Sequence, residues 1–292
     1  MTSFVHFLFR VLSVLPLPLL HALGGWLGWL AFGCSPTYRR RLLAHARLAG
    51  VTTGTTLAAV AEAGKLVTEL PRLWLGPPVR VGWEGAAHIE AAHAHGRGVL
   101  FLTPHLGCFE ITAQAYAQRF GAHRPMTVLF RPARQPWLQT LVARSRQRPG
   151  LQTAPTTLAG VKQLIKALKA GEVVGLLPDQ VPPHGQGVWA PFFGRQAYTM
   201  TLSARLAHAA HAQVLLAWGE RLRWGRGFLV HVRPYDEAAW GPLSEDAVTA
   251  ACQINQAMED LVRECPRQYL WSYDRYKSPA RPAVVADAPS AT

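Results

Sequence analysis

Six short apolar runs, separated by segments with helical periodicity, constrain the fold more than any other feature of this sequence. The runs begin at residues 79, 98, 125, 172, 212 and 228. The middle ones, GVLFLTP and EVVGLLP among them, are continuously apolar, as expected of strands that have helices on both faces. The alternation of strands and helices predicts an α/β fold in which a mixed, mainly parallel central sheet is flanked by helices.

Three further segments have the periodicity of helices. In LAGVKQLIKALKAG, four apolar residues share one face, and Lys162, Lys166 and Lys169 share the opposite face, which is the pattern of a solvated surface helix. The segments YTMTLSARLAHAAH and EDAVTAACQINQAMEDLVREC predict two more helices. The tail 279–292 is rich in Pro and Ala and is expected to be disordered, so residues 35–278 form the predicted main domain.

A long uncharged segment, from Val11 to Gly33, precedes this domain. It exceeds the roughly 20 residues that a membrane-spanning helix needs, although Pro16 and Pro18 interrupt the helical pattern. The basic stretch TYRRRLLAHAR follows, and basic residues beside a span stay on the cytoplasmic side. We therefore expect residues 1–34 to be an uncleaved membrane anchor that spans or only inserts, with the domain facing the cytoplasm. A cleaved signal peptide fits less well because only Arg10 is basic before the apolar run.

The charge of the chain favours an anionic partner. The formal net charge is +13, yet only 16% of the residues are charged, against about 25% in an average soluble domain. A chain that is both basic and apolar favours an anionic membrane surface or an acidic partner protein. Nucleic acid is not an expected partner, because no helix-turn-helix, zinc-finger or RNA-binding strand motif is present. The four Cys residues form no C-x-x-C pair, which favours a reducing compartment.

Polar residues directly follow two of the predicted strands. Pro104 and His105 come after GVLFLT, and Asp179 and Gln180 come after EVVGLLP. In open α/β sheets, ligands bind outside the carboxyl ends of the strands. If the two strands are parallel, these side chains face one crevice.

His105 and Glu110 are a candidate catalytic pair, although their spacing alone does not make them one. In a continuous helix, five residues rotate a side chain by about 500°, which would leave the two pointing apart. Pro104 and Gly107 instead predict a turn, with Glu110 in the first turn of the following helix. The Glu110 carboxylate could then bond to one ring nitrogen of His105, while the other ring nitrogen acts as a general base on a hydroxyl. The alternatives are a structural His, a metal half-site without a third ligand, and a thiol nucleophile at Cys108.

Several segments carry a resemblance to known families. The H-x4-E of His105 and Glu110 resembles the H-x4-D/E signature of glycerolipid acyltransferases. Residues 175–207, GLLPDQ…GVWAPFFGRQAYTMTLSARLA, resemble the D-Q, G-V, P-F-F-G and A-x-T block of the bacterial lipid A late acyltransferases. Residues 266–277, PRQYLWSYDRYK, resemble the C-terminal block of that family, and LFRPARQPWLQTLVARSR resembles its central R-P segment. The blocks occur in order, and the resemblance covers nearly the whole chain.

The resemblance implies transfer of a fatty acyl group from an acyl thioester, on acyl carrier protein or coenzyme A, to a hydroxyl of an anionic membrane lipid. It implies no cofactor and no metal, and it places the reaction at the bacterial inner membrane. In lipid A synthesis the hydroxyl belongs to a hydroxyacyl chain of a phosphorylated glucosamine disaccharide. Carried over to this sequence, His105 is the general base and Glu110 its orienting partner. The implied substrate-binding residues are Arg131 for the anionic acceptor, Asp179 and Gln180 for the crevice, and Phe192, Phe193 and Gly194 for the acyl channel.

Two departures from the family pattern leave the acceptor open. Cys108 and Phe109 stand where members often carry Asn and Trp, and Gln135 and Gln139 occupy the region where the central segment often carries Asn and Asp. The alternative acceptor is a lysophospholipid or another lysolipid, and a thioesterase would need no acceptor at all. A non-enzymatic, membrane-associated lipid-binding protein is the alternative outside the enzymes, and the intact H-x4-E pair disfavours it.

Overall fold

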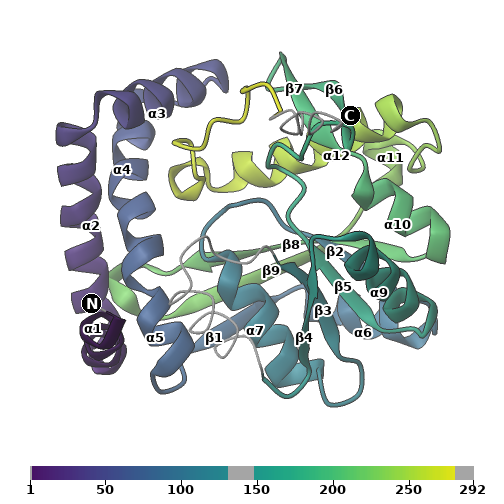
Figure 1. Cartoon of the computed structure of the whole chain (residues 1–292), viewed down its shortest axis with the longest axis horizontal. Helices are drawn as coiled ribbons and strands as arrows, with labels where there is room; N and C mark the ends of the chain where they lie inside the picture. Colours follow the sequence, from purple (N-terminus) through teal and green to yellow (C-terminus); the bar gives the residue numbers. More distant parts are fainter. Residues whose placement is uncertain (1, 131–147, 280–292) are drawn as a thin grey trace, which may run out of the picture.

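A computed structural model describes residues 2–130 and 148–279, and within them seven strands form one central sheet (Figure 1). The strand order is β1-β9-β8-β2-β5-β3-β4. Neighbouring strands run parallel except β8 and β9, which are antiparallel. The strands are β1 (Val81–Glu84), β2 (Val99–Leu102), β3 (Met126–Phe130), β4 (Leu151–Pro155), β5 (Val173–Leu176), β8 (Gln213–Arg221) and β9 (Phe228–Pro234). The predicted mixed, mainly parallel sheet is confirmed.

Helices cover both faces of this sheet. One face carries α6 (Ala86–Ala94) and α7 (Phe109–Phe120), and the other carries α9 (Leu158–Lys169), α10 (Leu202–Ala210) and α12 (Ala247–Glu264). Strand β2 shows why its sequence is continuously apolar. Val99 and Phe101 belong to the core under α6 and α7, whereas Leu100 and Leu102 belong to the core under α12. Successive residues of a strand face opposite sides of the sheet, so every residue of β2 is buried.

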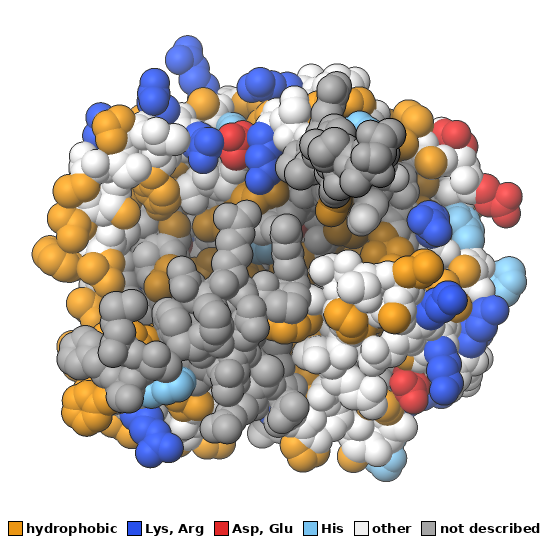
Figure 2. Space-filling model, in the orientation of Figure 1, with side chains coloured by type: hydrophobic (Ala, Val, Ile, Leu, Met, Phe, Trp, Pro, Cys, Tyr) orange, Lys and Arg blue, Asp and Glu red, His pale blue; other side chains and the backbone are white. Residues whose placement is uncertain are grey.

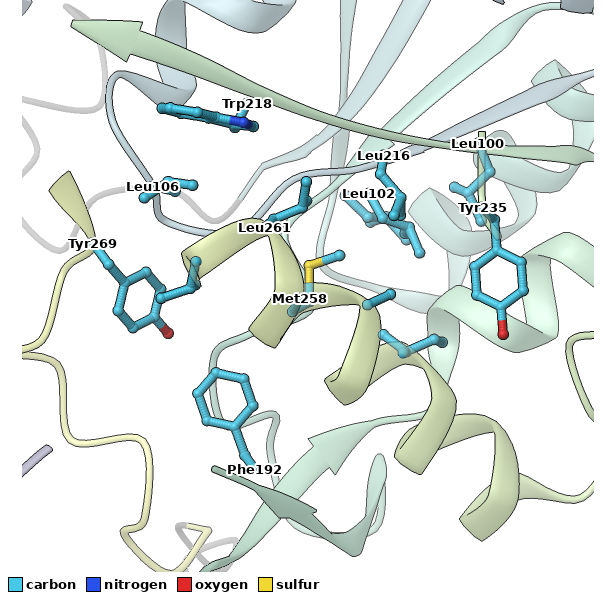
Figure 3. Close-up of a cluster of buried hydrophobic side chains, with 14 of the residues drawn as sticks. Leu100, Leu102, Leu106, Phe192, Leu216, Trp218, Tyr235, Met258, Leu261 and Tyr269 are labelled. Carbon is cyan, nitrogen blue, oxygen red and sulfur yellow. The ribbon is translucent and has the colours of Figure 1, made fainter. Parts of the chain in front are cut away.

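The core under α12 joins the sheet to a second, smaller layer. Figure 3 shows Met258 of α12 between Leu102 and Leu216 of the sheet and Phe192, which belongs to a β-hairpin. That hairpin consists of β6 (Gly187–Phe192) and β7 (Arg195–Met200). Each large apolar side chain that is fully buried contributes about 1.5–3 kcal/mol, so α12 holds the hairpin firmly over the sheet. The remaining short elements are α11 (Glu237–Trp240), η1 (Arg223–Gly225) and η2 (Pro266–Gln268).

The six predicted strands are present, but two features of this region differ from the sequence prediction. Residues 198–200 of YTMTLSARLAHAAH belong to β7, and α10 begins only at Leu202. Phe193 and Gly194 both have positive φ, 47° and 75°, and a two-residue turn of this kind returns the chain as a hairpin strand. Strand β4 was not predicted, because only Leu151 and Ala154 of its five residues are buried. The predicted disordered tail lies outside the described residues from position 280 onward.

The N-terminal residues form a layer of helices at one side of the sheet (Figure 1). They are α1 (Thr2–Val14), α2 (Leu17–Cys34), α3 (Pro36–Leu48), α4 (Thr53–Thr68) and α5 (Leu70–Leu75). Among the described residues, α2 alone is long and apolar enough to cross a bilayer, judged by length and composition, so the predicted apolar N-terminal helix is present. It packs along α4, where small residues let the two backbones approach closely.

The contact between α2 and α4 gives a prediction about glycine. A Cβ atom at Gly64 of α4 would lie 1.9 Å from the carbonyl oxygen of Gly24 of α2. We expect Gly64→Ala to lower the free energy of unfolding by about 1–3 kcal/mol, because the helices must move apart. Gly54→Ala in the same helix is the matched control, since its Cβ would have no atom within 4 Å, and Ala favours the helix by up to about 1 kcal/mol. Equal melting temperatures for the two variants in detergent would contradict this packing.

Candidate active site

His105 and Asp179 meet because their strands are neighbours in parallel register. Strands β2 and β5 pair with Leu102 opposite Leu176, and His105 and Asp179 each lie three residues beyond that pair. Parallel strands deliver the residues that follow them to the same edge of a sheet. The two polar segments that were predicted to share a crevice therefore lie side by side.

The carboxylate of Asp179 holds both the main chain and the ring of His105. Its Oδ2 accepts a hydrogen bond from the backbone N–H of His105 at 2.8 Å, and its Oδ1 lies 2.7 Å from ring Nδ1. An ionised carboxylate can only accept, so Nδ1 carries the proton and Nε2 of the neutral ring keeps a lone pair. The side-chain amide nitrogen of Gln180 lies 2.9 Å from Nε2 and donates to that lone pair.

Asp179 is buried and nevertheless ionised. Burial raises the pKa of Asp179, but the charge and hydrogen bonds of His105 together outweigh burial and hold this pKa below its usual value. The hydroxyl of Tyr269 donates a further hydrogen bond to Oδ2 at 3.2 Å, and burial raises the pKa of Tyr269, which keeps the proton on the phenol. The Asp179 side chain is 2% exposed and the imidazole 14%, so the carboxylate is sealed while the ring reaches the surface.

Main-chain bonds fix the turn that carries His105. The carbonyl of His105 accepts from the N–H of Leu270 at 3.1 Å, and the N–H of Gly107 donates to the carbonyl of Gln268 at 3.0 Å. Gly107 has a φ of 60°, and a Cβ there would lie 2.0 Å from the carbonyl oxygen of Gly219. Only glycine fits both constraints. The predicted turn is confirmed, and residues of the C-terminal block, 266–277, stabilise it through these hydrogen bonds.

A buried ion cluster lies beneath this turn. The guanidinium of Arg221 binds Glu69 through Nε and Nη2, both at 2.7 Å, and Glu62 through Nη1 at 2.8 Å. Its Nη2 also donates to the carbonyl of Gly107 at 3.3 Å, and Nε2 of His21 lies 3.1 Å from Glu69. Burial raises the pKa of Glu69, but Arg221 overrides burial and lowers it to about 2. The cluster links α2 and α4 to the turn that carries the imidazole.

Glu110 lies in the first turn of α7, as predicted. However, Asp179 occupies the position beside the His105 ring that was predicted for Glu110. Both ring nitrogens of His105 are occupied, by Asp179 and Gln180. Helix α7 leaves the turn on the other face of the sheet, where Oε2 of the buried Glu110 accepts from the indole N–H of Trp74 at 3.5 Å. The described structure therefore shows Asp179, and not Glu110, as the acceptor for the His105 ring, and a catalytic role for Glu110 stays a prediction.

Cys108 does not have the environment of a nucleophile. Its side chain is fully buried, and burial, followed by the charge of Glu69, raises the pKa of Cys108 well above its usual value. A reactive thiol requires the opposite, a lowered pKa and access to solvent. The next residue, Phe109, packs its ring on the His105 imidazole with 4.9 Å between centroids. This stretch supports the imidazole and adds no second reactive group.

Of the three hairpin residues that were expected to line an acyl channel, Phe192 and Phe193 pack into the core and Gly194 is exposed. Phe192 is 2% exposed and lies under the guanidinium of Arg275, 5.1 Å from the ring centroid. The rings of Phe193 and Trp271 are 5.7 Å apart, and Gly194 completes the turn. These contacts hold the C-terminal block against the hairpin. Arg131, the predicted contact for an anionic acceptor, lies outside the described residues.

A cavity of about 650 Å³ opens beside Trp74, the residue that donates to Glu110. Its wall includes Trp74 and Ile111, and the cations Arg72 and Arg148 also line it. An apolar wall with guanidinium groups suits an amphiphile that carries an anionic group. Sequence analysis did not find this cavity, because its walls come from α5, α7 and residues 148–149, which are far apart in the chain.

The geometry at His105 makes this ring a candidate general base. A ring whose Nδ1–H is held by a buried carboxylate and whose Nε2 is unprotonated can take a proton from a hydroxyl. In the part of the chain that the structure describes, no group of three His, Cys, Asp or Glu side chains could hold a metal ion. The structure thus places a candidate general base at the carboxyl edge of the sheet, where open α/β sheets bind their ligands.

Comparison with known proteins identifies the group that is transferred. A family model described as bacterial lipid A biosynthesis acyltransferase matches residues 1–278, and the chain belongs to this family. The lipid A biosynthesis lauroyltransferase of Escherichia coli (strain K12) is 30% identical over 223 residues, which cover 74% of this chain and 69% of that protein. The palmitoleoyltransferase of the same strain is 27% identical over the same shares, and the myristoyltransferase is 27% identical over 66% of this chain and 57% of that protein. The protein is an acyltransferase, and the resemblance seen in the sequence is confirmed.

The contact between Asp179 and His105 predicts a large loss of activity when the carboxylate is removed. Asp179→Asn should lower kcat about 10²–10⁴-fold at neutral pH, because an amide neither fixes the Nδ1–H tautomer nor stabilises the imidazolium. Steady-state kinetics of the purified variant measure this loss, and its melting temperature shows whether the fold is kept. A folded Asp179→Asn variant with the kcat of wild type would contradict this assignment.

Proposed function

We propose that this enzyme transfers a fatty acyl group from an acyl thioester on acyl carrier protein to a hydroxyl of a lipid A precursor, at the cytoplasmic face of the bacterial inner membrane. The observation that carries the proposal is the His105 ring, held by Asp179 with Nε2 unprotonated at the carboxyl edge of the sheet. The names of the relatives, which are lauroyl-, palmitoleoyl- and myristoyltransferases, support a fatty acyl group as the one transferred.

The proposed reaction begins when the acceptor hydroxyl takes the place of the Gln180 amide at Nε2 of His105. The ring removes the hydroxyl proton while the oxygen attacks the thioester carbonyl and the new C–O bond forms. The C–S bond then breaks, and the leaving thiolate takes the proton from the imidazolium. Asp179 stays ionised throughout because its pKa is lowered, so it stabilises the positive ring in the transition state. The step needs no covalent acyl-enzyme.

We place the anionic part of a substrate on the basic wall of the cavity beside Trp74. Arg72 and Arg148 line this cavity, and a planar guanidinium binds phosphate through two parallel hydrogen bonds. Burial lowers the pKa of Arg148, and the charge of Glu110 opposes this effect, so Glu110 offsets part of the cost of burying this cation. Glu110 is thus proposed to support the binding of substrate and not the imidazole, and Arg131 is proposed as a further contact to the acceptor.

Charge and hydropathy support the proposed donor and location. Acyl carrier protein is an acidic partner, and a chain with a net charge of +13 attracts such a partner as well as an anionic lipid surface. The apolar helix α2 supports attachment to a membrane. The basic residues that follow it, at positions 39–41 and 47, support the cytoplasmic side for the domain.

The acceptor is tested by expressing the enzyme in bacteria that lack their late lipid A acyltransferases. Mass spectrometry should show lipid A with one additional acyl chain, and His105→Ala, as the matched control, should lose this product while its melting temperature stays close to that of the wild type. If only phospholipids gain acyl chains, the acceptor is a lysolipid and the lipid A proposal is wrong. Release of free fatty acid without acylated lipid would identify a thioesterase instead.

A further inference from the structure

The N-terminal layer of helices has a charge pattern that the proposed reaction does not explain. The first 61 residues contain no Asp or Glu, and the first carboxylate in the sequence is Glu62. In Figure 2, hydrophobic side chains gather along the left edge, over α1 and α2, with Lys and Arg above and below them. An apolar surface on a segment that contains basic and no acidic residues complements an anionic bilayer better than it complements a protein of mixed charge.

Helix α2 presents one face to the protein and the opposite face to the outside. The face against the body contains Leu17, Leu20, His21, Gly24 and Gly28, all of them buried. The exposed stripe on the opposite side consists of Leu19, Leu23, Trp26 and Leu30, and the exposed Leu27 and Trp29 flank it. In helix α1, Phe7, Leu8, Val11 and Val14 extend the exposed apolar surface. Spacings of three and four residues place each set on a single side of its helix.

A distant part of the chain adds a tryptophan to this surface. Trp224 lies in η1, the turn between β8 and β9, and is 84% exposed. Its backbone has a φ of 61°, a strained conformation for a bulky residue, and its indole faces outward. The next residue, Gly225, packs against Pro18 at the start of α2, so Trp224 adjoins the exposed stripe. Its neighbours Arg223 and Arg226 are exposed as well.

The contacts of α2 oppose a transmembrane orientation. With 18 residues the helix is about 27 Å long, close to the thickness of the hydrocarbon core. It is tied to α4 along this length, because Thr68 donates to the carbonyl of Leu20, His21 binds Glu69, and Gly24 touches Gly64. To cross a bilayer, α2 would have to leave α4 or draw α4 and its buried ion cluster into the hydrocarbon, and both alternatives are costly.

We infer that α1, α2 and the Trp224 turn form one interfacial docking surface, which lies in a single leaflet of an anionic bilayer and does not cross it. The apolar stripe enters the boundary between headgroups and acyl chains. Trp224 sits at headgroup level, where tryptophan is enriched, and Arg223 and Arg226 bind lipid phosphate. The inference rests on the proposed action at a membrane, and it adds that binding to the bilayer holds the body in one orientation through two elements far apart in sequence.

The first test measures binding of the purified full-length protein to protein-free vesicles by flotation. Wild type should float with vesicles of phosphatidylethanolamine and phosphatidylglycerol, and less with pure phosphatidylcholine or at high salt. A combined Arg223→Gln, Trp224→Gln and Arg226→Gln variant should partition more weakly by at least about thirtyfold, as expected for two interfacial Arg residues. The matched control combines Trp189→Gln, Arg97→Gln and Arg205→Gln, all at exposed positions elsewhere, and should bind like wild type. Equal loss in both variants would overturn a specific role for the turn.

The second test asks whether α2 crosses the membrane. Cys34 at the end of α2 is exposed and free, and Arg10→Cys adds a thiol before the start of α2. The partly exposed Cys252 is first replaced by Ser. In inside-out membrane vesicles, an impermeant maleimide should label both positions, because both lie on the cytoplasmic side. Labelling of Cys34 alone would show that α2 spans the bilayer and would overturn the inference.

A third measurement separates this inference from the proposed function. With detergent-dispersed acceptor, the variant with the three substitutions at positions 223, 224 and 226 should keep the acyl transfer rate of wild type, because none of these residues contacts His105. If wild type floats with vesicles but transfers no acyl group, the proposed function is wrong and the docking surface stands. If wild type binds native membranes but no protein-free vesicle, the surface binds a protein partner and the inference is wrong.

Discussion

One buried carboxylate, that of Asp179, organises the candidate active site. It binds the main chain and the ring of His105 at once, so the position and the tautomer of the imidazole are set by a single group. The sheet brings the two residues together, because β2 and β5 are adjacent and in parallel register. The C-terminal block completes the arrangement, since Tyr269 donates to the same carboxylate and Leu270 bonds to the carbonyl of His105. The hairpin and α12 are needed chiefly to hold that block in place.

A second charged group, Arg221, connects this site to the N-terminal helices. It binds Glu69 and Glu62 and also the carbonyl of Gly107, two residues after the base. Removing one partner from such a cluster leaves an uncompensated buried charge, which costs several kcal/mol. The helices that form the proposed membrane surface are therefore part of the same rigid unit as the turn that carries His105. An enzyme that takes a lipid from a bilayer benefits from this rigidity, because its orientation on the membrane then fixes the orientation of its base.

The sequence predicts the sheet well and the contacts of the active site only in part. Runs such as GVLFLT are buried on both faces, and that property is visible in composition alone. Because His105, Asp179 and Gln180 directly follow two of these runs, the sequence also predicts that they are neighbours. Glu110 was expected beside the ring because it is close in sequence, whereas the register between β2 and β5 decides which carboxylate reaches the ring. Glu69 and Arg221 are 152 residues apart in the sequence, and no local sequence pattern indicates a contact over such a separation. Residues 198–200 at the end of β7 were predicted as helix, because the hairpin turn depends on the backbone conformation at Phe193, which composition does not reveal.

The central claim, that Asp179 fixes the tautomer of His105, is tested most directly by nitrogen-15 NMR of the imidazole nitrogens at neutral pH. The resonances are assigned by their disappearance in His105→Ala. The structure predicts that Nδ1 carries the proton and Nε2 does not, since an ionised carboxylate lies 2.7 Å from Nδ1. In Asp179→Asn the preference for this tautomer should weaken, whereas in Glu110→Gln it should persist. A ring protonated on Nε2 in the wild-type enzyme would contradict the account.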